Sequence, residues 1–378
     1  MKRDARPAFV ISTSKGKETN TMEQITLYYK EGNSDKIYQA SITPKDGGYV
    51  VQFAYGRRGT TLQTGTKTQA PVPYEQAKKI YDKLIAEKTA KGYTPGEGGT
   101  PYQYTEREQQ NTGILPQLLN AIEDDEVYRF IYDPAFCAQE KFDGKRILIR
   151  KEDAAIDGIN RKGLMCGIPS VLVNEVRQIP GNCVIDGESV GEVFWAFDIL
   201  TIHGTDVRSQ PYRDRLFALN QIISADFGFL KLADTALDLA EKAELLDKLR
   251  RENREGIVFK SLSAAYVVGR PASGGDNLKH KFYATASFIV NRVNGKRSVS
   301  LMLFDGPKVV PAGNVTIPPN HEIPIVGDVV EARYLYAFRE SGCIYQPVYL
   351  GKRTDITTEE CTVAQLKYKV AEEERAAA

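Results

Sequence analysis

The stretch Lys141-Phe142-Asp143-Gly144-Lys145-Arg146 places a lysine amine, an Asp-Gly pair and two further cations within six residues. Asp-Gly favours a tight turn, so we expect this stretch to begin at the end of a strand. A solvated surface turn would have the same composition. A catalytic role therefore requires partners elsewhere in the chain that suit a nucleophilic lysine.

Further polar motifs follow this stretch in a fixed order. They are Asn160-Arg161-Lys162-Gly163, Asp186-Gly187-Glu188, Phe194-Trp195-Ala196-Phe197-Asp198, Glu255-Gly256-Ile257-Val258-Phe259-Lys260 and Leu278-Lys279-His280-Lys281. The ordered series resembles the nucleotidyltransferase superfamily of ATP-dependent polynucleotide ligases and capping guanylyltransferases, over most of the chain after residue 113. The resemblance implies that Lys141 is the AMP-accepting nucleophile and that ATP is the cofactor.

Two lysines near the end of the series fit this chemistry. An amine must be unprotonated to attack a phosphate, and both burial and neighbouring cations disfavour the ammonium form. Lys279 and Lys281 are alternate residues of one expected strand, so they face the same way. We expect them to oppose protonation of Lys141 and to offset phosphate charge. A solvated strand face is the alternative.

Carboxylates beside nucleotide phosphates require a divalent cation, because two anions repel each other. Glu255 is the best candidate ligand for Mg²⁺ or Mn²⁺. Glu188 matches a family position that contacts the ribose or shares the metal, and the resemblance does not decide between the two. It also implies that Lys260 binds phosphate and that Arg146 contacts the ribose.

Three more residues match substrate contacts of the family. Phe197 occupies the position whose ring stacks on the purine, with core packing as the alternative. Arg161 matches an arginine that engages the 5′-phosphate of the strand being joined. Arg353 begins a resemblance to the final ligase motif, Arg-x-Asp-Lys, which orients pyrophosphate. Ile356 stands where the lysine is expected, so a simple barrel turn is almost as good an interpretation of this segment.

The N-terminal part reads as a separate unit over residues 22–93. Alternating apolar and polar residues predict strands near 25–29, 36–42 and 49–55, and apolar residues at helical spacing predict a helix from Tyr74 to Lys91. We expect a small sheet that is covered by one helix.

A glycine-rich turn in this unit carries two arginines. Tyr55-Gly56-Arg57-Arg58-Gly59 resembles the signature of the WGR domain found in DNA-break-sensing proteins, with Tyr55 in place of the namesake tryptophan. The resemblance implies that Arg57 and Arg58 contact nucleic-acid phosphates. A solvated hairpin tip is the alternative.

The fold class is predicted as α+β with several domains. Residues 1–21 and 371–378 are expected to be disordered tails, and residues 94–112, rich in Gly, Pro and Thr, to be a linker. Strands alternate with helices over residues 113–283, which is the expected nucleotidyltransferase (adenylation) domain. Strands alone over residues 284–370 predict an OB-fold barrel of five strands, although a β-sandwich fits nearly as well.

Bulk composition excludes some classes. With 50 basic and 49 acidic residues, net charge does not indicate a nucleic-acid partner, but the first hundred residues hold 16 Lys and Arg against 10 Asp and Glu. Five scattered cysteines without a CxxC pair argue against a disulfide framework and a zinc site, and hence against the zinc-containing NAD-dependent ligases. No signal peptide or membrane segment is evident, so we expect a cytoplasmic monomer.

These motifs predict an ATP-dependent DNA ligase that seals nicks in three steps. Lys141 takes AMP from ATP, AMP passes to a 5′-phosphate, and a 3′-hydroxyl displaces it. The expected partner is nicked or broken duplex DNA, in replication, repair or recombination.

An ATP-dependent RNA ligase is the first alternative. One RNA-sealing branch carries Asn at the position of Arg146 and lacks the acid at Asp143, so the motif favours DNA. A capping-type guanylyltransferase and a non-catalytic DNA-end-binding protein are further alternatives. Retention of Lys141, Glu188 and Glu255 argues against the last of these.

Overall fold

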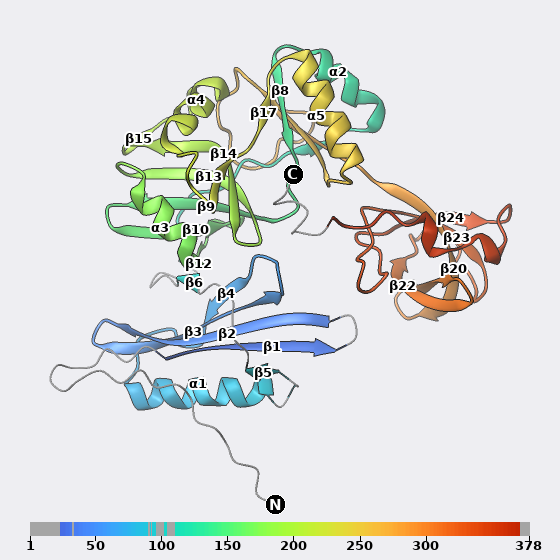
Figure 1. Cartoon of the computed structure of the whole chain (residues 1–378), viewed down its shortest axis with the longest axis horizontal. Coiled ribbons are helices and arrows are strands. Elements are labelled where there is room, and N and C mark those ends of the chain that lie inside the picture. The colour runs from blue at the N-terminus through green and yellow to red at the C-terminus, as the bar shows by residue number, and fades with distance from the viewer. Residues whose placement is uncertain are drawn as a thin grey trace, which may run out of the picture.

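A computed structural model describes residues 23–31, 34–89, 91, 93–95, 102–103 and 110–370 of the 378-residue chain. These residues form an N-terminal, a central and a C-terminal unit; in Figure 1 the N-terminal unit lies below the central one and the C-terminal unit lies to its lower right. The tails predicted at residues 1–21 and 371–378 lie outside the described residues, as does most of the linker predicted at residues 94–112.

The N-terminal unit is one antiparallel sheet and one helix. Its strands are β1 (Glu23–Glu31), β2 (Ser34–Lys45), β3 (Gly48–Arg57), β4 (Gln63–Thr66) and β5 (Thr94–Pro95), in the order β4-β3-β2-β1-β5. Helix α1 (Tyr74–Thr89) covers the face that points away from the central unit (Figure 1). Its Ala77, Tyr81 and Leu84 pack on apolar residues of the sheet, so the predicted sheet and helix are confirmed.

The central unit contains two sheets. The first has the order β11-β10-β9-β13-β14-β15, with β16 parallel to β14. Its strands are β9 (Lys145–Glu152), β10 (Ala155–Asn160), β11 (Met165–Cys166), β13 (Cys183–Val190), β14 (Val193–Ile202), β15 (Thr205–Asp206) and β16 (Leu230–Leu232). Helices α3 (Ser170–Gln178) and α4 (Tyr212–Ile222) bury Leu172 and Leu219 against it.

The second sheet of the central unit has the order β17-β8-β18-β19-β7. Its strands are β7 (Asn120–Ala121), β8 (Phe136–Glu140), β17 (Thr235–Ala236), β18 (Gly256–Ser261) and β19 (Asn277–Lys281). Helices α2 (Val127–Tyr132) and α5 (Leu239–Arg251) pack on it. Helix α5 is N-capped by Asp238, whose carboxylate accepts from the backbone N–H of Glu241 at 2.9 Å. A short pair, β6 (Tyr102–Gln103) with β12 (Ile168–Pro169), lies apart.

The C-terminal unit is a five-stranded antiparallel sheet in the order β22-β21-β20-β23-β24. Its strands are β20 (Ala284–Asn294), β21 (Ser298–Asp305), β22 (Lys308–Thr316), β23 (Val329–Tyr334) and β24 (Val348–Arg353). Phe288, Leu301 and Val330 lie in its buried core. The strand count is as predicted, and among the described residues no ladder joins β22 to β24, so the sheet is open in its hydrogen bonding.

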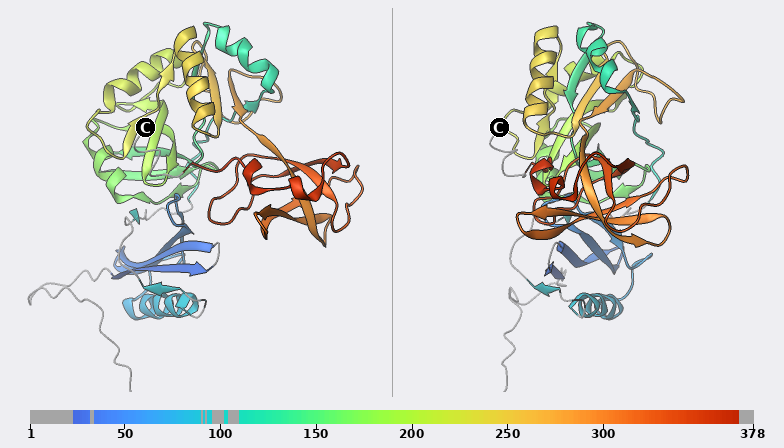
Figure 2. Two further views of the ribbon diagram at one scale, coloured as in Figure 1. Left: turned by 45° about the vertical axis from the view of Figure 1, so that its right-hand side comes forward. Right: turned by 90° about the vertical axis from the view of Figure 1, so that its right-hand side faces the viewer.

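The three units meet near the segment that joins β8 to β9, because Lys145 donates to the carbonyl of Leu62 at 3.1 Å and Tyr336 donates to Asp143 at 2.6 Å. Figure 2 shows the N-terminal and C-terminal units at the lower end of the central unit. Within the described part of the chain, no helix has both the length and the apolar character needed to cross a membrane.

Candidate active site

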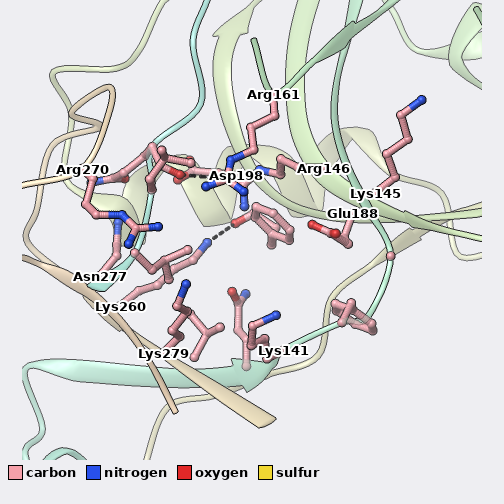
Figure 3. Close-up of a pocket in the computed structure, with 18 of the residues that line it drawn as sticks. Lys141, Lys145, Arg146, Arg161, Glu188, Asp198, Lys260, Arg270, Asn277 and Lys279 are labelled. Carbon is pink, nitrogen blue, oxygen red and sulfur yellow. Dashed lines mark hydrogen bonds between the residues drawn. The ribbon is translucent and has the colours of Figure 1, made fainter. Parts of the chain in front are cut away.

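Lys141 directly follows β8, where the chain crosses from the second sheet of the central unit to the first. Its backbone N–H donates to the carbonyl of Gly256 at 3.0 Å, which fixes the start of the crossing. A cavity of about 560 Å³ lies between the two sheets, and the Lys141 side chain points into it (Figure 3). We call it the active-site cavity. Seven predicted residues line it: Lys141, Arg146, Arg161, Glu188, Phe197, Lys260 and Lys279.

Gly144 explains how the nucleophile segment fits against β13. A Cβ atom at this position would lie 2.3 Å from the carbonyl oxygen of Ser189. This distance is much shorter than a van der Waals contact, and the Ser189 backbone is fixed by its place in β13. Glycine is therefore required for close approach, which is a stronger reason than the flexibility of an Asp-Gly turn.

Glu255 holds two lysines at once. Its carboxylate lies 2.5 Å from the amine of Lys141 and 2.8 Å from that of Lys281. Only 5% of the Glu255 side chain is exposed, so these charge pairs are largely shielded from water. Lys281 also donates to the side chain of Gln346 in the C-terminal unit at 3.0 Å. The carboxylate predicted as a metal ligand is thus directly bonded to the predicted nucleophile.

Glu188 lies opposite Arg146 in the ladder between β13 and β9 and lines the active-site cavity. Burial raises the pKa of its carboxyl to about 7, although the nearby cations Arg146 and Lys141 act in the other direction. The side chain of Glu188 has no hydrogen bond or ion pair to any residue that the structure describes. A carboxyl of this kind is available for a ribose hydroxyl or for a cation.

The donor set suits magnesium or manganese. Mg²⁺ is commonly held by one or two carboxylates together with substrate phosphate oxygens, which matches Glu188, Glu255 and a bound nucleotide. Among the described residues no group of three or more His, Cys, Asp or Glu side chains is arranged to hold a metal without substrate. The assignment of a metal to Glu255 and Glu188 stays a prediction.

Arg146 is locked in place by a buried carboxylate. Its guanidinium donates two hydrogen bonds of 2.7 Å to Asp186, which is fully buried and also accepts from the hydroxyl of Tyr266 at 2.6 Å. The guanidinium lies 4.4 Å from the centre of the Phe197 ring. Arg146 is therefore fixed, with its position on the cavity wall set by Asp186.

Phe197 forms a ring surface that is held by cations. The amine of Lys260 lies 4.4 Å from the ring centre and donates to the carbonyl of Phe197 at 3.1 Å (Figure 3). Burial lowers the pKa of Lys260 to about 8. The ring lines the cavity with 8% of the residue exposed, so Phe197 packs in the core and also faces the cavity.

The two predicted strand lysines divide their roles. Lys279 faces the active-site cavity (Figure 3), and its pKa falls to about 8 because of burial and then of neighbouring cations, Lys141 first among them. Lys281, on the same side of β19, pairs with Glu255. His280 lies between them on the other face, with its Nδ1 atom 3.2 Å from the carbonyl of Ile122.

Several cavity residues were not predicted. Arg270 and Asn277 point into the cavity (Figure 3), and Gln117 and Tyr266 also line it. Gln117, Tyr266 and Arg270 lie outside the named strands and match no motif, and the glycine-rich stretch around Arg270 was the available signal there. Asn277 directly precedes the Leu278 motif in β19, and this position beside a motif was a signal that sequence reasoning missed. Arg270 extends the basic wall formed by Arg161 and Lys279.

Three predicted arginines lie outside the active-site cavity. Arg353 pairs with Asp355 at 2.7 Å and with Glu331 at 3.3 Å. Ile356, which stands in place of the expected lysine, packs against the core of the C-terminal sheet, which gives this departure a structural reason. Arg57 is the last residue of β3, and Arg58 follows it in the turn after this strand.

Both arginines of that turn already have partners within the chain. Arg57 pairs with Glu340 of the C-terminal unit at 3.0 Å, and its guanidinium lies 4.8 Å from the ring centre of Phe338. Arg58 pairs with Asp35 at 3.0 Å. Their predicted phosphate contacts stay predictions.

Two family models match the chain. The WGR domain model matches residues 21–100, and the ATP dependent DNA ligase domain model matches residues 188–281. This chain is similar to the ATP-dependent DNA ligases and, over its N-terminal unit, to WGR domains. Both predicted resemblances are thereby confirmed. The ligase match spans Glu188, Phe197, Glu255, Lys260, Lys279 and Lys281.

Solved ligase structures resemble the chain at low identity. The ligase domain of M. tuberculosis LigD is 19% identical, with a TM-score of 0.40, and the match covers 66% of this chain and 98% of that one. A Lig E DNA ligase is 18% identical, with a TM-score of 0.49 and coverage of 64% and 99%. The Chlorella virus DNA ligase-adenylate is 17% identical, with a TM-score of 0.33 and coverage of 64% and 99%. No curated protein sequence matches this chain.

Proposed function

We propose that this chain is an ATP-dependent DNA ligase that seals nicks through a lysyl-AMP intermediate. The observation that carries the proposal is the position of Lys141, in a cavity that it shares with six other predicted residues. In the first step the Nζ atom of Lys141 bonds to the α-phosphorus of ATP and pyrophosphate leaves. AMP then passes to the 5′-phosphate at the nick, and the 3′-hydroxyl displaces AMP to close the strand.

Glu255 has two proposed roles in the first step. Its Oε2 atom lies 2.5 Å from the Lys141 amine and is placed to take the proton that the amine must lose. Lys281 stays bonded to the other carboxylate oxygen at 2.8 Å and holds the group in position. Lys279, with Arg161 and Arg270 beside it, offsets phosphate charge as it develops in the transition state.

We propose that a magnesium or manganese ion binds together with ATP. Glu188 and Glu255 would supply its protein ligands, and the ion would neutralise phosphate charge. Arg146 and Phe197 would form the nucleoside wall, with the Phe197 ring against the purine. The locked geometry of Arg146 supports this assignment, because a fixed wall orients the nucleoside at little entropic cost.

We also propose finer assignments for the domains and partners. Residues 22–93 are the WGR domain, residues 113–283 the adenylation domain and residues 284–370 an OB-fold domain that closes over duplex DNA, where Arg353 would reach pyrophosphate. Arg161 would hold the 5′-phosphate, and Arg57 and Arg58 would grip the backbone of broken DNA. Roles in replication, repair or recombination, a cytoplasmic location and a monomeric state stay predictions.

DNA is preferred to RNA on the motif at Lys141. Arg146, which is held by Asp186, stands where one RNA-sealing branch has asparagine. RNA ligation remains the second candidate function. Sealing of a nicked RNA duplex with no sealing of nicked DNA would establish it in place of the first.

The decisive experiment is labelling with α-phosphate-labelled ATP. We expect the wild-type chain to form a covalent AMP adduct and the Lys141→Ala variant to form none. A matched control is Lys308→Ala, since Lys308 is an exposed lysine in the C-terminal unit, remote from the nucleophile in sequence. Label that stays on Lys141→Ala protein would rule out the assigned nucleophile.

A further inference from the structure

A second cavity, of about 660 Å³, lies where the three units meet. The turn after β3 (residues 57–61), the nucleophile segment (residues 143–145) and the C-terminal segment 336–340 each form part of its wall, together with residues 189–191, 345 and 369–370. We call it the junction cavity. Its volume lies within the range of roughly 300–1,000 Å³ that is usual for ligand sites.

The wall of the junction cavity is predominantly basic. Five basic side chains contribute to it, against the two carboxylates of Asp143 and Glu340. The basic residues are Arg57, Arg58, Lys145, Arg339 and Lys369. The three units all supply cations, so the positive charge exists only when they are assembled. Such a wall favours an anion with several charges.

The charge pair between Arg57 and Glu340 is weak enough to exchange. Arg57 and Glu340 are 34% and 69% exposed, and exposed pairs contribute about 0–1 kcal/mol. Asp143 is held more firmly, because it pairs with Lys369 at 3.2 Å and accepts from the hydroxyl of Tyr336 at 2.6 Å. Arg339 lies near the ring of Tyr368 and has no ion pair among the described residues. A phosphate can therefore replace Glu340 at modest cost and reach Arg339 without displacing a carboxylate.

The junction cavity shares a wall with the active-site cavity. Gly144 and Lys145 line both of them, so the two spaces are adjacent at the nucleophile segment. An anion that extends from one cavity to the other must carry charge at intervals along its length. A polynucleotide backbone has this property, whereas a single small anion fills only one of the two spaces.

The N-terminal unit is bonded directly to this shared wall. The hydroxyl of Thr61 donates to the carbonyl of Ser189 at 2.8 Å, and the amine of Lys145 donates to the carbonyl of Leu62 at 3.1 Å. Ser189 is also the residue that requires glycine at position 144. The turn after β3 is thus fixed against the nucleophile segment, and the junction cavity has defined walls.

We propose that the junction cavity binds the sugar-phosphate backbone of the polynucleotide whose reacting end lies in the active-site cavity. The inference rests on the proposed ligase function and specifies a second contact region for its substrate. Phosphates displace Glu340 from Arg57, and Arg339 contributes a cation that has no ion pair to an internal carboxylate among the described residues.

The test compares Arg339→Gln with Arg292→Gln. Both residues are exposed arginines of the C-terminal unit, but Arg292 lines neither cavity. Affinity for a fluorescent nicked duplex is measured by anisotropy over a salt series. We expect Arg339→Gln to bind about tenfold more weakly, as for one lost charge-assisted contact, and its log–log salt slope to be smaller in magnitude by about 0.9. Equal losses in both variants, or none in Arg339→Gln, would overturn the inference.

Labelling by ATP separates this inference from the proposed function. A wild-type chain that takes no label overturns the ligase proposal. If Arg339→Gln takes label normally but keeps full nucleic-acid affinity, only the junction-cavity inference fails. Normal labelling also shows that the variant is folded.

A second experiment locates the strand directly. A nicked duplex with 5-iodouracil placed near the nick is irradiated with the full chain, and the cross-linked peptides are identified. We expect adducts on Phe338 or Tyr345, the aromatic residues at the less buried side of the junction cavity. Adducts confined to other surfaces would contradict the proposal.

Inorganic pyrophosphate is the other source of the same phosphate chemistry. It is added to the ATP-labelling reaction of the wild type and of Arg339→Gln. The proposal expects both to be inhibited alike. If only the variant resists pyrophosphate while its nucleic-acid affinity is unchanged, the cavity is a pyrophosphate site and the proposal is wrong.

Discussion

The amine of Lys141 lies 2.5 Å from the carboxylate of Glu255, and the proposed nucleophile and the candidate metal ligand therefore hold each other before substrate arrives. ATP binding must loosen this contact, because the amine has to reach phosphorus and the carboxylate has to meet a cation. The pair keeps both groups ordered in a site that is rich in lysine and arginine.

Replacing Glu255 by glutamine tests this relationship. Glutamine keeps the shape of the side chain but can neither take the amine proton nor hold a cation by charge. We expect the rate of AMP labelling to fall by at least about 100-fold, the lower end of a general-base contribution. Single-turnover labelling at saturating ATP gives the measurement. A rate within threefold of wild type would show that Glu255 is only structural.

Lys279 predicts a change in ATP affinity at alkaline pH. Its pKa is lowered to about 8, so the side chain is charged below this pH and loses its charge as the pH rises through it. We expect the KM for ATP to rise roughly tenfold between pH 7 and 9.5 through loss of one charge-assisted contact. Glu188, with its pKa raised to about 7, loses its remaining proton in the lower part of this window, so the change above pH 8 is the part that reports on Lys279.

The control for this pH profile is Lys279→Arg. Arginine stays protonated throughout the range, so the variant should show a smaller rise in KM above pH 8, and Lys260, whose pKa is also lowered to about 8, accounts for the rise that remains. An identical rise in both proteins would assign the pH dependence to another group.

The buried Arg146–Asp186 pair predicts a large loss of stability in Asp186→Asn. The substitution leaves the guanidinium without a charged partner in a buried site, which typically costs about 3–5 kcal/mol. The matched control is Asp206→Asn, because Asp206 makes a similar two-point contact with Arg208 on the exposed surface. That variant should lose less than about 1 kcal/mol. Urea unfolding followed by circular dichroism measures both, and equal losses would disprove the special role of burial.

Removal of residues 1–93 tests the contribution of the N-terminal, WGR-like unit. We expect affinity for broken DNA to fall while AMP labelling persists, since the active-site cavity is lined entirely by residues of the central unit. Labelling of the truncated chain is compared with labelling of the point variant Thr61→Val. That variant keeps the N-terminal unit and loses only the hydroxyl bonds to β13 and to Gly191. Loss of labelling together with DNA binding would argue against a separable accessory domain.

The sequence predicted seven of the residues that line the active-site cavity, because each of the seven is part of a short motif in a fixed order. It could not predict their pairing. Arg146 meets Asp186 because of the register between β9 and β13, and Lys141 meets Glu255 because β8 pairs with β18. Register between strands distant in sequence depends on the whole sheet and not on local patterns.

The placement of Arg353 and Arg57 was also beyond the sequence. The distance of Arg353 from the active-site cavity depends on how the C-terminal unit is oriented. Arg57 pairs with Glu340 of another unit, 283 positions away in the sequence. Ile356, by contrast, was noticed as a departure from the motif. Its explanation required the core of the C-terminal sheet, which no local pattern reveals.

Trp195 stacks on Phe142, with ring centres 4.9 Å apart and planes inclined by 14°. Phe142 is the residue next to Lys141, and Trp195 is the single tryptophan of the chain. The protein therefore contains an intrinsic fluorophore in contact with its own nucleophile segment. The tryptophan fluorescence of the unlabelled protein can therefore follow movement of that segment in a single-turnover stopped-flow experiment.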